Sequence, residues 1–327
     1  MKRNQALSFC RILATLFILV CHIIKYYTFI PGHLQLGQFF NIGVPMFIII
    51  SGYLYGIKSR RGAQQEVNIK KYVIGRYVRV ALPSQIWAII IFTITLGGYA
   101  VNTLMVVLNI QGLSWIIQYP GIPNGGPYLS HSWFVTVILI CYVLVPVLNG
   151  CIHRITWRHI AFLYIMGIAL EFVNINIFYF LLFVVSFYVS SNEVRVNKLN
   201  SILIVGSIVL CIAIRLAGHE FLDGTKIYND YITTFTHQIS AAAIIILCSK
   251  ITEKTNMISR ITESKVGEFI EQHSYSIYLV HYSLIPIIFS NMPVLPATIA
   301  FLAATAVLAL GLDLIAGKVG VEILKRV

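Results

Sequence analysis

Long apolar stretches separated by short polar ones occupy almost the whole chain. Hydropathy along the sequence predicts about ten apolar segments, at residues 7–27, 39–57, 80–100, 132–150, 159–173, 176–190, 199–217, 231–249, 269–290 and 294–316. A helix of about 20 residues crosses the hydrocarbon core of a bilayer at a rise of 1.5 Å per residue. Because only helices and closed barrels satisfy their backbone in lipid, the pattern predicts an all-α polytopic membrane protein, with one domain over residues 1–327.

The segments at 159–173 and 176–190 allow two interpretations. Each is short for a membrane span, and the polar residue Asn174 separates them. They form either two spans or one re-entrant hairpin. Both arrangements return the chain to the same side of the membrane, so the orientation of the later segments does not depend on the choice.

Composition supports the membrane interpretation, and the distribution of charge gives an orientation. Of the 327 residues, 58% are hydrophobic and 11% are charged, which lies outside the range of soluble domains. If residue 1 is cytoplasmic, only Lys25, Arg215 and Lys226 among the 24 Lys and Arg residues fall on or near the outer side. Since Lys and Arg gather on cytoplasmic loops, we expect both termini in the cytoplasm. The connection at 101–131, rich in Pro and Gly, is then an outer loop or an interfacial flap.

The basic excess and the cysteines predict no further chemistry. Topogenic loops explain the formal net charge of +12, so we expect no nucleic-acid partner. The cysteines lack the paired spacing of a zinc site or of a disulfide framework, and no metal site is expected. Packing in or beside apolar segments is the role expected for Cys10, Cys21, Cys141, Cys151, Cys211 and Cys248.

The first apolar segment carries two ionisable residues, Arg11 and His22. Ionisable groups on a membrane span cost a few kcal/mol near the bilayer centre, so they usually face a protein interior or a wet cavity and mark a functional path. Eleven residues at 100° each make three turns plus about 20°, which places both side chains on nearly one stripe, roughly 16 Å apart. Arg11 and His22 are therefore the first candidate functional residues.

The stretch 58–79 is predicted to be a strongly basic cytoplasmic loop. Against the single acid Glu66 it carries Lys58, Arg60, Arg61, Lys70, Lys71, Arg76 and Arg79. The last two form Arg76-x-x-Arg79 just before the third segment. Residues i and i+3 share a helical face, so these guanidinium groups are suited to grip one phosphate cluster, helped by the positive end of the span that follows. The alternative is that these charges only set topology.

Five different short motifs occur along the chain, in an order typical of one family. They are Arg11-x10-His22 in the first segment, Gly43-Val44-Pro45-Met46-Phe47 with Ser51-Gly52-Tyr53-Leu54 in the second, Arg76-x-x-Arg79 before the third, His131-Ser132-Trp133-Phe134 with Tyr142 and Pro146 in the fourth, and Ser274 to His281 in the ninth. In these motifs the chain resembles the membrane acyltransferase 3 family of bacterial envelope O-acyltransferases. The resemblance spans nearly the whole sequence.

The resemblance implies a multi-pass protein of the bacterial cytoplasmic membrane that moves an acyl group, usually acetyl. The donor would be cytoplasmic acetyl-CoA or another acyl-CoA, and the acceptor a hydroxyl of an envelope polysaccharide or of a lipid-linked glycan precursor. By the same resemblance His22 is the key catalytic residue, Arg11 is required, and Arg76 with Arg79 binds the CoA. The chain departs from many members by Ser8 in place of an Asp, and no appended soluble domain is expected.

Acyl transfer from a thioester needs a base for the hydroxyl proton and a donor that stabilises the oxyanion. His22 suits the role of base, or that of a nucleophile that carries the acyl group itself. Tyr275 and His281 are candidate cavity residues, with hydrogen bonding between helices as the alternative. Other polar residues on or near spans are Glu171, Asp313 and Arg215, expected to pair, line a cavity or snorkel, and His131 with Trp133, expected in an aromatic belt.

Two functions from other classes compete with the enzyme. One is a transporter or exporter of an envelope glycan or small solute. The other is a membrane sensing or anchoring module. Consumption of acyl-CoA by the purified protein would separate the enzyme from both.

Overall fold

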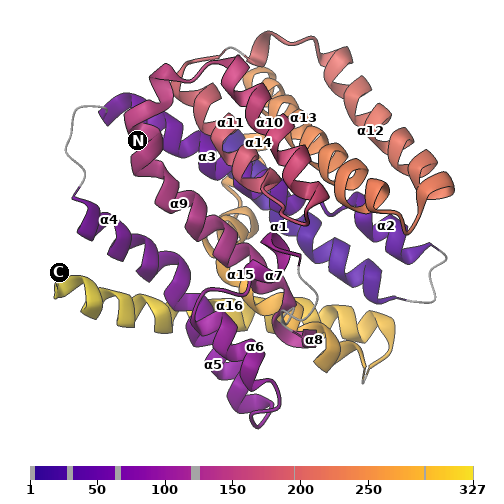
Figure 1. Ribbon diagram of the computed structural model, residues 1–327. Helices are drawn as coiled ribbons and strands as arrows, with labels where there is room; N and C mark the ends of the chain where they lie inside the picture. Colours follow the sequence, from indigo (N-terminus) through magenta and orange to yellow (C-terminus); the bar gives the residue numbers. More distant parts are fainter. Residues whose placement is uncertain are drawn as a thin grey trace. The chain divides into compact units, whose positions relative to one another are not determined.

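The computed structural model describes residues 4–27, 32–62, 68–118, 126–194, 196–290 and 292–326, and every regular element among them is a helix (Figure 1). Each of the predicted apolar segments overlaps a helix or a run of helices, although the segment at 80–100 leaves the helix after Ile94. The all-α membrane fold predicted from the hydropathy pattern is therefore confirmed. The predicted Pro- and Gly-rich run at 119–125 and residue Glu66 lie outside the described residues.

Among the described residues, seven helical stretches are long and apolar enough to cross a membrane. They are Gln5–Tyr26, Leu36–Arg61, Ile69–Ile94, Gly126–Arg154, Ser201–Leu222, Ile227–Lys254 and Val294–Lys325. The remaining predicted segments are α10 (Trp157–Phe172), α11 (Phe178–Ser191) and α15 (Lys265–Phe289). α10 and α11 have 16 and 14 residues, and α15 carries polar side chains along its first half. Seven of the ten predicted segments therefore meet the length and composition of a membrane span among the described residues, and the count of about ten stays a prediction.

The basic stretch 58–79 is mostly helical, which corrects its prediction as a loop. α3 (Gly43–Gly62) extends to Gly62, and the third span already begins at Ile69 with α4 (Ile69–Arg76). It continues without a break through the π-helix η1 (Tyr77–Ala81) into α5 (Leu82–Ile94). Lys and Arg are good helix formers, so a basic run can extend a membrane helix into water. The positive N-terminal end of this span consequently lies at Ile69, not beside Arg76 and Arg79.

The chain divides into two compact units, each built from two separate stretches of sequence. Unit 1 comprises residues 1–61 and 181–274, and unit 2 comprises residues 62–180 and 275–327. The division falls inside α15, after Ser274.

Unit 1 contains α1 (Gln5–Tyr26), α2 (His33–Phe39), nearly all of α3, most of α11, η4 (Val196–Lys198), α12 (Ser201–Leu222), η5 (Ile227–Ile232), α13 (Thr233–Lys254), α14 (Met257–Thr262) and the start of α15. α12 and α13 pack side by side, and α1 packs against α2, α13 and α14 (Figure 1). α3 approaches α11 through Gly52 and Gly56. A Cβ on Gly52 would lie 2.5 Å from the carbonyl oxygen of Phe183. This small-xxx-small spacing lets two helix backbones meet, as is common in membrane proteins.

Unit 2 contains α4, η1, α5, α6 (Ala100–Val107), α7 (Leu113–Ile116), α8 (Gly126–Leu129), η2 (Ser130–Ser132), α9 (Trp133–Cys151), η3 (Ile152–Arg154), α10, the rest of α15 and α16 (Val294–Lys325). Buried polar contacts tie its helices together. The Trp87 indole N–H on α5 donates to Ser283 Oγ on α15 at 3.1 Å, and Ser283 donates to the carbonyl oxygen of Tyr128 at 2.7 Å. In lipid such bonds between helices supply cohesion that apolar contact alone does not.

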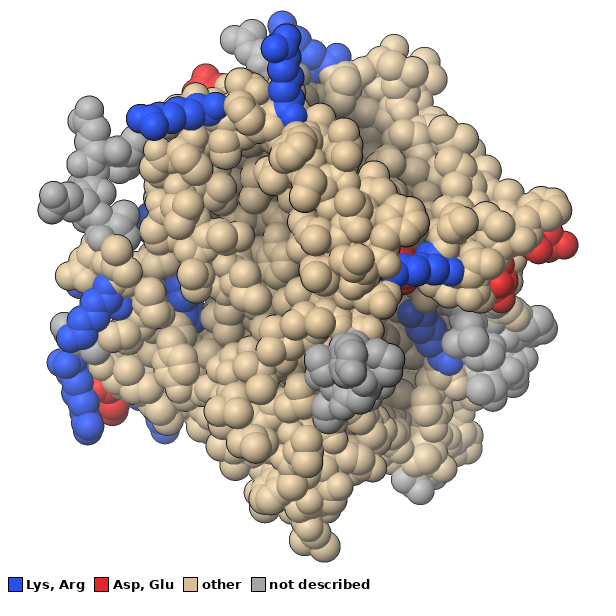
Figure 2. Space-filling view, in the orientation of Figure 1, with Lys and Arg blue, Asp and Glu red and all other residues tan. Residues whose placement is uncertain are grey.

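The outer surfaces of the helices are apolar in a way that water would not tolerate. α12 and α16 expose large apolar side chains such as Ile202, Leu203, Val307 and Leu314. Figure 2 shows that charged side chains are few and isolated on the visible face. Contiguous exposed apolar area of this kind marks contact with a membrane, so the chain is a multi-pass membrane protein.

Candidate functional site

Arg11 and His22 lie on one uninterrupted helix, α1. The helix is fixed at its start by the Asn4 side chain, which accepts a hydrogen bond from the Leu7 N–H at 3.1 Å, a regular N-cap. Both side chains are half-buried. Because α1 is a continuous α-helix, the offset of roughly 16 Å along one stripe applies to this pair.

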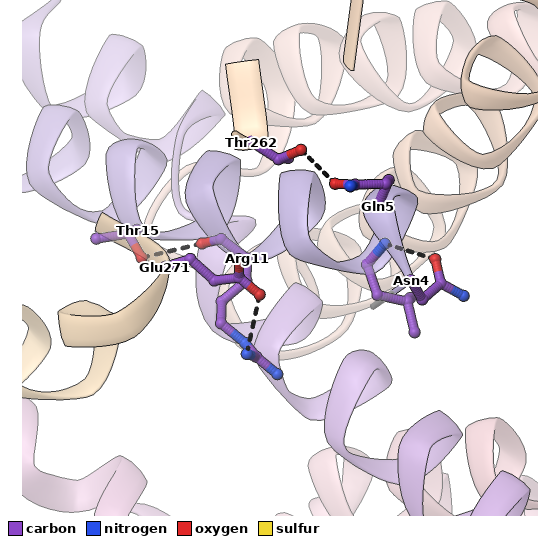
Figure 3. Close-up of polar contacts among 7 residues, drawn as sticks. Asn4, Gln5, Arg11, Thr15, Thr262 and Glu271 are labelled. Atoms are coloured by element: carbon purple, nitrogen blue, oxygen red, sulfur yellow. Dashed lines mark hydrogen bonds and ion pairs between the residues drawn. The ribbon is translucent and has the colours of Figure 1, made fainter. Parts of the chain in front are cut away.

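Arg11 is held by an acidic residue that the sequence analysis missed. Its guanidinium Nη1 lies 3.5 Å from Oε1 of Glu271 on α15, within unit 1 (Figure 3). The Arg11 and Glu271 side chains are 32% and 12% exposed. The resemblance implies an Asp three residues before this arginine in many relatives, where this chain has the buried Ser8. Glu271 supplies a carboxylate from a helix about 260 residues further along the sequence.

A second set of contacts near Arg11 docks the start of α1 on α14. The Gln5 amide donates to Glu263 Oε1 at 2.8 Å, and the Thr262 hydroxyl donates to the Gln5 side-chain oxygen (Figure 3). The Thr15 hydroxyl bonds back to the Arg11 carbonyl oxygen at 2.9 Å. Side chains from α14 and α15 thus fix the half of α1 that carries Arg11.

His22 lies in the other half of α1, where α2 packs closely. A Cβ on Gly37 of α2 would lie 2.5 Å from Lys25 Cγ, so this glycine allows the helices to approach. Cys21 is buried, and adjacent helical residues point about 100° apart, so Cys21 and His22 occupy different faces. The half of α1 that carries His22 thus packs against α2.

Arg76 and Arg79 lie in unit 2 and have different environments. The Arg76 guanidinium carbon lies 5.6 Å from the ring centroid of Tyr72 and 5.8 Å from that of Tyr142, both cation–π distances. Arg79 is exposed. Tyr72 donates its hydroxyl to the carbonyl oxygen of Tyr142 at 2.9 Å, which joins α4 to α9. The Tyr142 of the fourth-segment motif thus helps to position Arg76.

The π-helix η1 changes how the arginine pair is displayed. It begins at Tyr77, directly after Arg76, and includes Arg79. A π turn closes i→i+5 bonds, so its residues advance through a smaller angle than in an α-helix. Arg76 and Arg79 consequently lie further apart around the axis than the i, i+3 prediction assumed.

Tyr275 and His281 lie on the part of α15 that belongs to unit 2. The Tyr275 hydroxyl donates to the carbonyl oxygen of Val80 in η1 at 2.6 Å. His281 is fully buried, and its Nδ1 lies 2.7 Å from the Tyr278 carbonyl oxygen of its own helix. Tyr278 donates to the carbonyl oxygen of His131. In this structure these residues make hydrogen bonds along and between helices of unit 2.

His131 and Trp133 both contact other rings of unit 2. His131 is buried, with Nε2 at 2.9 Å from the Leu279 carbonyl oxygen and its ring centroid 5.5 Å from that of His281. Trp133 is half-buried and stacks on Trp115 with ring centroids 4.5 Å apart. His131 thus belongs to the interior of unit 2, and the aromatic belt stays a prediction for Trp133.

The remaining polar residues on spans also have defined contacts. Glu171 accepts a hydrogen bond from the Gln118 amide at 2.9 Å, and Asp313 accepts one from the Ser276 hydroxyl. The Arg215 guanidinium carbon lies 4.8 Å from the ring centroid of Phe39. No group of three or more His, Cys, Asp or Glu side chains among the described residues is placed to hold a metal ion.

The predicted site residues thus form two groups, one in each unit: Arg11 and His22 in unit 1, and Arg76, Arg79, Tyr275 and His281 in unit 2. A family model described as an acyltransferase domain matches residues 4–316, a range that includes all six. No curated protein and no solved structure matches the chain. Since the match covers nearly the whole sequence of this multi-pass helical protein, the chain belongs to the acyltransferase 3 family and is a membrane acyltransferase.

Proposed function

We propose that this protein is an O-acyltransferase of the bacterial cytoplasmic membrane. It moves an acetyl or other short acyl group from cytoplasmic acyl-CoA to a hydroxyl of an envelope polysaccharide or of a lipid-linked glycan precursor. The observation that carries the proposal is α1, where a half-buried histidine lies three turns from an arginine that Glu271 holds. An imidazole on a membrane helix of an acyltransferase is suited to proton transfer to or from a reacting oxygen.

His22 acts as a general base in the simplest scheme. As the acceptor hydroxyl oxygen bonds to the thioester carbonyl carbon, His22 removes the hydroxyl proton. When the carbonyl re-forms, the carbon–sulfur bond breaks and the proton passes from the imidazolium to the leaving CoA thiolate. In the alternative scheme the imidazole nitrogen first takes the acyl group, CoA leaves, and the hydroxyl then attacks the acyl-imidazole.

Arg76 and Arg79 bind the phosphate groups of CoA in this proposal. Guanidinium forks match phosphate oxygens, and the Arg76 guanidinium lies within cation–π distance of the Tyr72 and Tyr142 rings. Arg11 belongs to the cytoplasmic half of α1. The rise of roughly 16 Å from Arg11 to His22 is about the length of the pantetheine arm, so an arm that lies along α1 from Arg11 brings its thioester to His22.

The test uses purified protein in lipid nanodiscs with radiolabelled acetyl-CoA. His22→Ala should keep acetyl-CoA binding and lose about 10²- to 10⁴-fold in acyl transfer, the range of general-base catalysis. His22→Gln should be nearly as inactive, because an amide takes up no proton near neutral pH. His153→Gln is the matched control, since His153 is exposed on η3.

The outcomes separate the alternatives. A fully active His22→Gln variant would remove His22 from the chemistry, and an acetylated His22 trapped without acceptor would make it the nucleophile. A folded wild-type protein that neither binds nor consumes acyl-CoA would contradict the enzyme and favour the transporter or exporter. Mass spectrometry of envelope glycans from cells with and without the gene identifies the acceptor.

A further inference from the structure

A cluster of cationic side chains lies in the part of unit 1 that contains His22. We name it the Arg215 cluster. It brings together α1, α2, α12, η5 and α13 through Lys25, Phe39, Arg215, Tyr228 and His237. The proposed acyl transfer uses none of these side chains.

Arg215 is buried in a way that snorkelling does not explain. Its residue is 5% exposed, and its guanidinium lies over the Phe39 ring. Its backbone carbonyl oxygen accepts the Tyr228 hydroxyl at 3.3 Å. The Arg215 Nε is buried without a hydrogen-bond partner among the described residues. A snorkelling arginine would extend its charged head to the interface, whereas this one keeps the head inside the protein.

Lys25 and His237 meet α2 at the two residues before Phe39, over which Arg215 lies. Lys25 packs on Gly37, where a Cβ would lie 2.5 Å from Lys25 Cγ. His237 is buried, with Nε2 at 2.9 Å from the Gln38 carbonyl oxygen. Two cations and an imidazole are therefore gathered in one place.

Acids do not compensate this charge within the described part of the chain. Asp223 lies 3.3 Å from His219, and Asp230 interacts with Lys226. No described carboxylate is within ion-pair distance of Arg215 or Lys25. A buried cation without a partner is costly, so the buried Arg215, with the half-buried Lys25 nearby, is suited to bind an anion.

We propose that Arg215 and Lys25 bind a phosphate ester group of the acyl acceptor. This rests on the proposed function, because it places the acceptor next to His22. Lys25 follows His22 by three residues, about 4.5 Å along α1, on the adjoining part of the same face. Two neighbouring cations favour a phosphate, which carries more charge than a carboxylate and offers oxygens that match the guanidinium fork. The acceptor class is then a phosphate-bearing, lipid-linked glycan rather than a neutral sugar.

The experiment measures binding of farnesyl phosphate and of farnesol to the protein in phosphatidylcholine nanodiscs. The wild type should bind farnesyl phosphate at least about tenfold more tightly than farnesol, the gain expected from charge-assisted hydrogen bonds. Arg215→Met should abolish this preference, and Lys25→Gln should reduce it. Arg158→Met, a substitution of an exposed arginine on α10, should leave it unchanged. Acetyl-CoA binding should be the same in all four proteins.

Several results would overturn the inference. A folded Arg215→Met variant that keeps the phosphate preference would make Arg215 a packing residue. If Arg215→Met does not fold, an unchanged preference in Lys25→Gln would overturn it instead. Competition by phosphatidylglycerol nanodiscs would assign the site to bilayer lipid, and loss of acetyl-CoA binding in Arg215→Met would assign it to the donor.

The result also separates this inference from the proposed function. A wild type that never consumes acyl-CoA but shows the Arg215-dependent preference refutes only the acyl transfer. A wild type that transfers acetyl groups but has no phosphate preference refutes only the Arg215 cluster as an anion site.

Discussion

Arg11 in unit 1 and Arg76 in unit 2 are both candidate site residues, and the protein holds them in different ways. Arg11 meets a carboxylate, Glu271, at 3.5 Å. Arg76 lies over the rings of Tyr72 and Tyr142. A carboxylate binds the edge of a guanidinium, where its N–H donors lie, whereas a ring takes its flat face. The carboxylate contact suits Arg11 to a positioning role, whereas the contacts described for Arg76 are with aromatic rings.

If Arg76 binds CoA, it must lie on the cytoplasmic side of the membrane. Labelling of introduced cysteines tests this side, and each position should either react in intact cells or not react. Cysteine introduced at exposed Lys71 or Lys254 should react with an impermeant maleimide only after the cells are permeabilised. Cysteine at Gly224, between α12 and η5, should react in intact cells. The parent protein is the control, because five of its six cysteines are buried. Labelling at Lys71→Cys in intact cells would contradict cytoplasmic CoA binding by Arg76.

The next largest effect is expected from the arginine pair itself. Arg76→Ala or Arg79→Ala should weaken acetyl-CoA binding by about 10- to 150-fold, because a hydrogen bond to a charged group is worth about 1.5–3 kcal/mol. Lys at either position should restore part of the affinity, since the planar fork is lost. Isothermal titration in nanodiscs measures the change. If both folded Ala variants bind acetyl-CoA like the parent, these charges only set topology.

Breaking the Arg11 pair should act on stability as well as on activity. Glu271→Ala leaves a half-buried guanidinium unpaired and should lower the free energy of unfolding by about 1–3 kcal/mol. The double variant Arg11→Met with Glu271→Met should recover most of this loss, because no charge remains. Thermal unfolding in bicelles measures both. Independent, additive effects of the two Met substitutions would show that the pair contributes no coupling.

The smallest expected effect tests the ring face beneath Arg76. Tyr142→Leu should weaken acetyl-CoA binding by a few-fold, consistent with about 0.5–1 kcal/mol for a partly exposed cation–π contact. Tyr142→Phe keeps the ring and should bind like the parent. The bond from the Tyr72 hydroxyl goes to the backbone of residue 142 and survives both changes. Equal weakening by Leu and Phe would assign the effect to the hydroxyl instead.

The helices and the first candidate residues could be predicted because both depend on local pattern. Apolar runs gave each helix, and the eleven-residue spacing of Arg11 and His22 needs only a continuous α1. The ends of the helices could be predicted less well. The span predicted to reach residue 100 ends at Ile94, since Leu96 and Gly97 adopt positive φ values of 49° and 79°. The local sequence does not predict a leucine with positive φ, because residues other than Gly, Asn and Asp rarely adopt that conformation.

Glu271 and the π-helix could not be predicted for a different reason. The partner of Arg11 is chosen by how α15 packs on α1 in the folded unit, and the sequence offers several acids of equal standing. The only local signal for Glu271 is its place three residues before the motif that runs from Ser274 to His281. The π turn at Tyr77–Ala81 inserts extra backbone into an apolar run with ordinary periodicity, and its Val80 carbonyl oxygen is used by Tyr275, far away in sequence.

The close approach of α3 and α11 sets an order of events during synthesis. Gly52 and Gly56 belong to the first stretch of unit 1, while Phe183 and the rest of the second stretch follow only after residues 62–180. At 5–20 residues per second, about 120 residues take roughly 6–24 s to synthesise. During that interval the glycine face of α3 has no α11 to cover it. A nascent chain paused before residue 181 should therefore expose this face to lipid or to membrane chaperones.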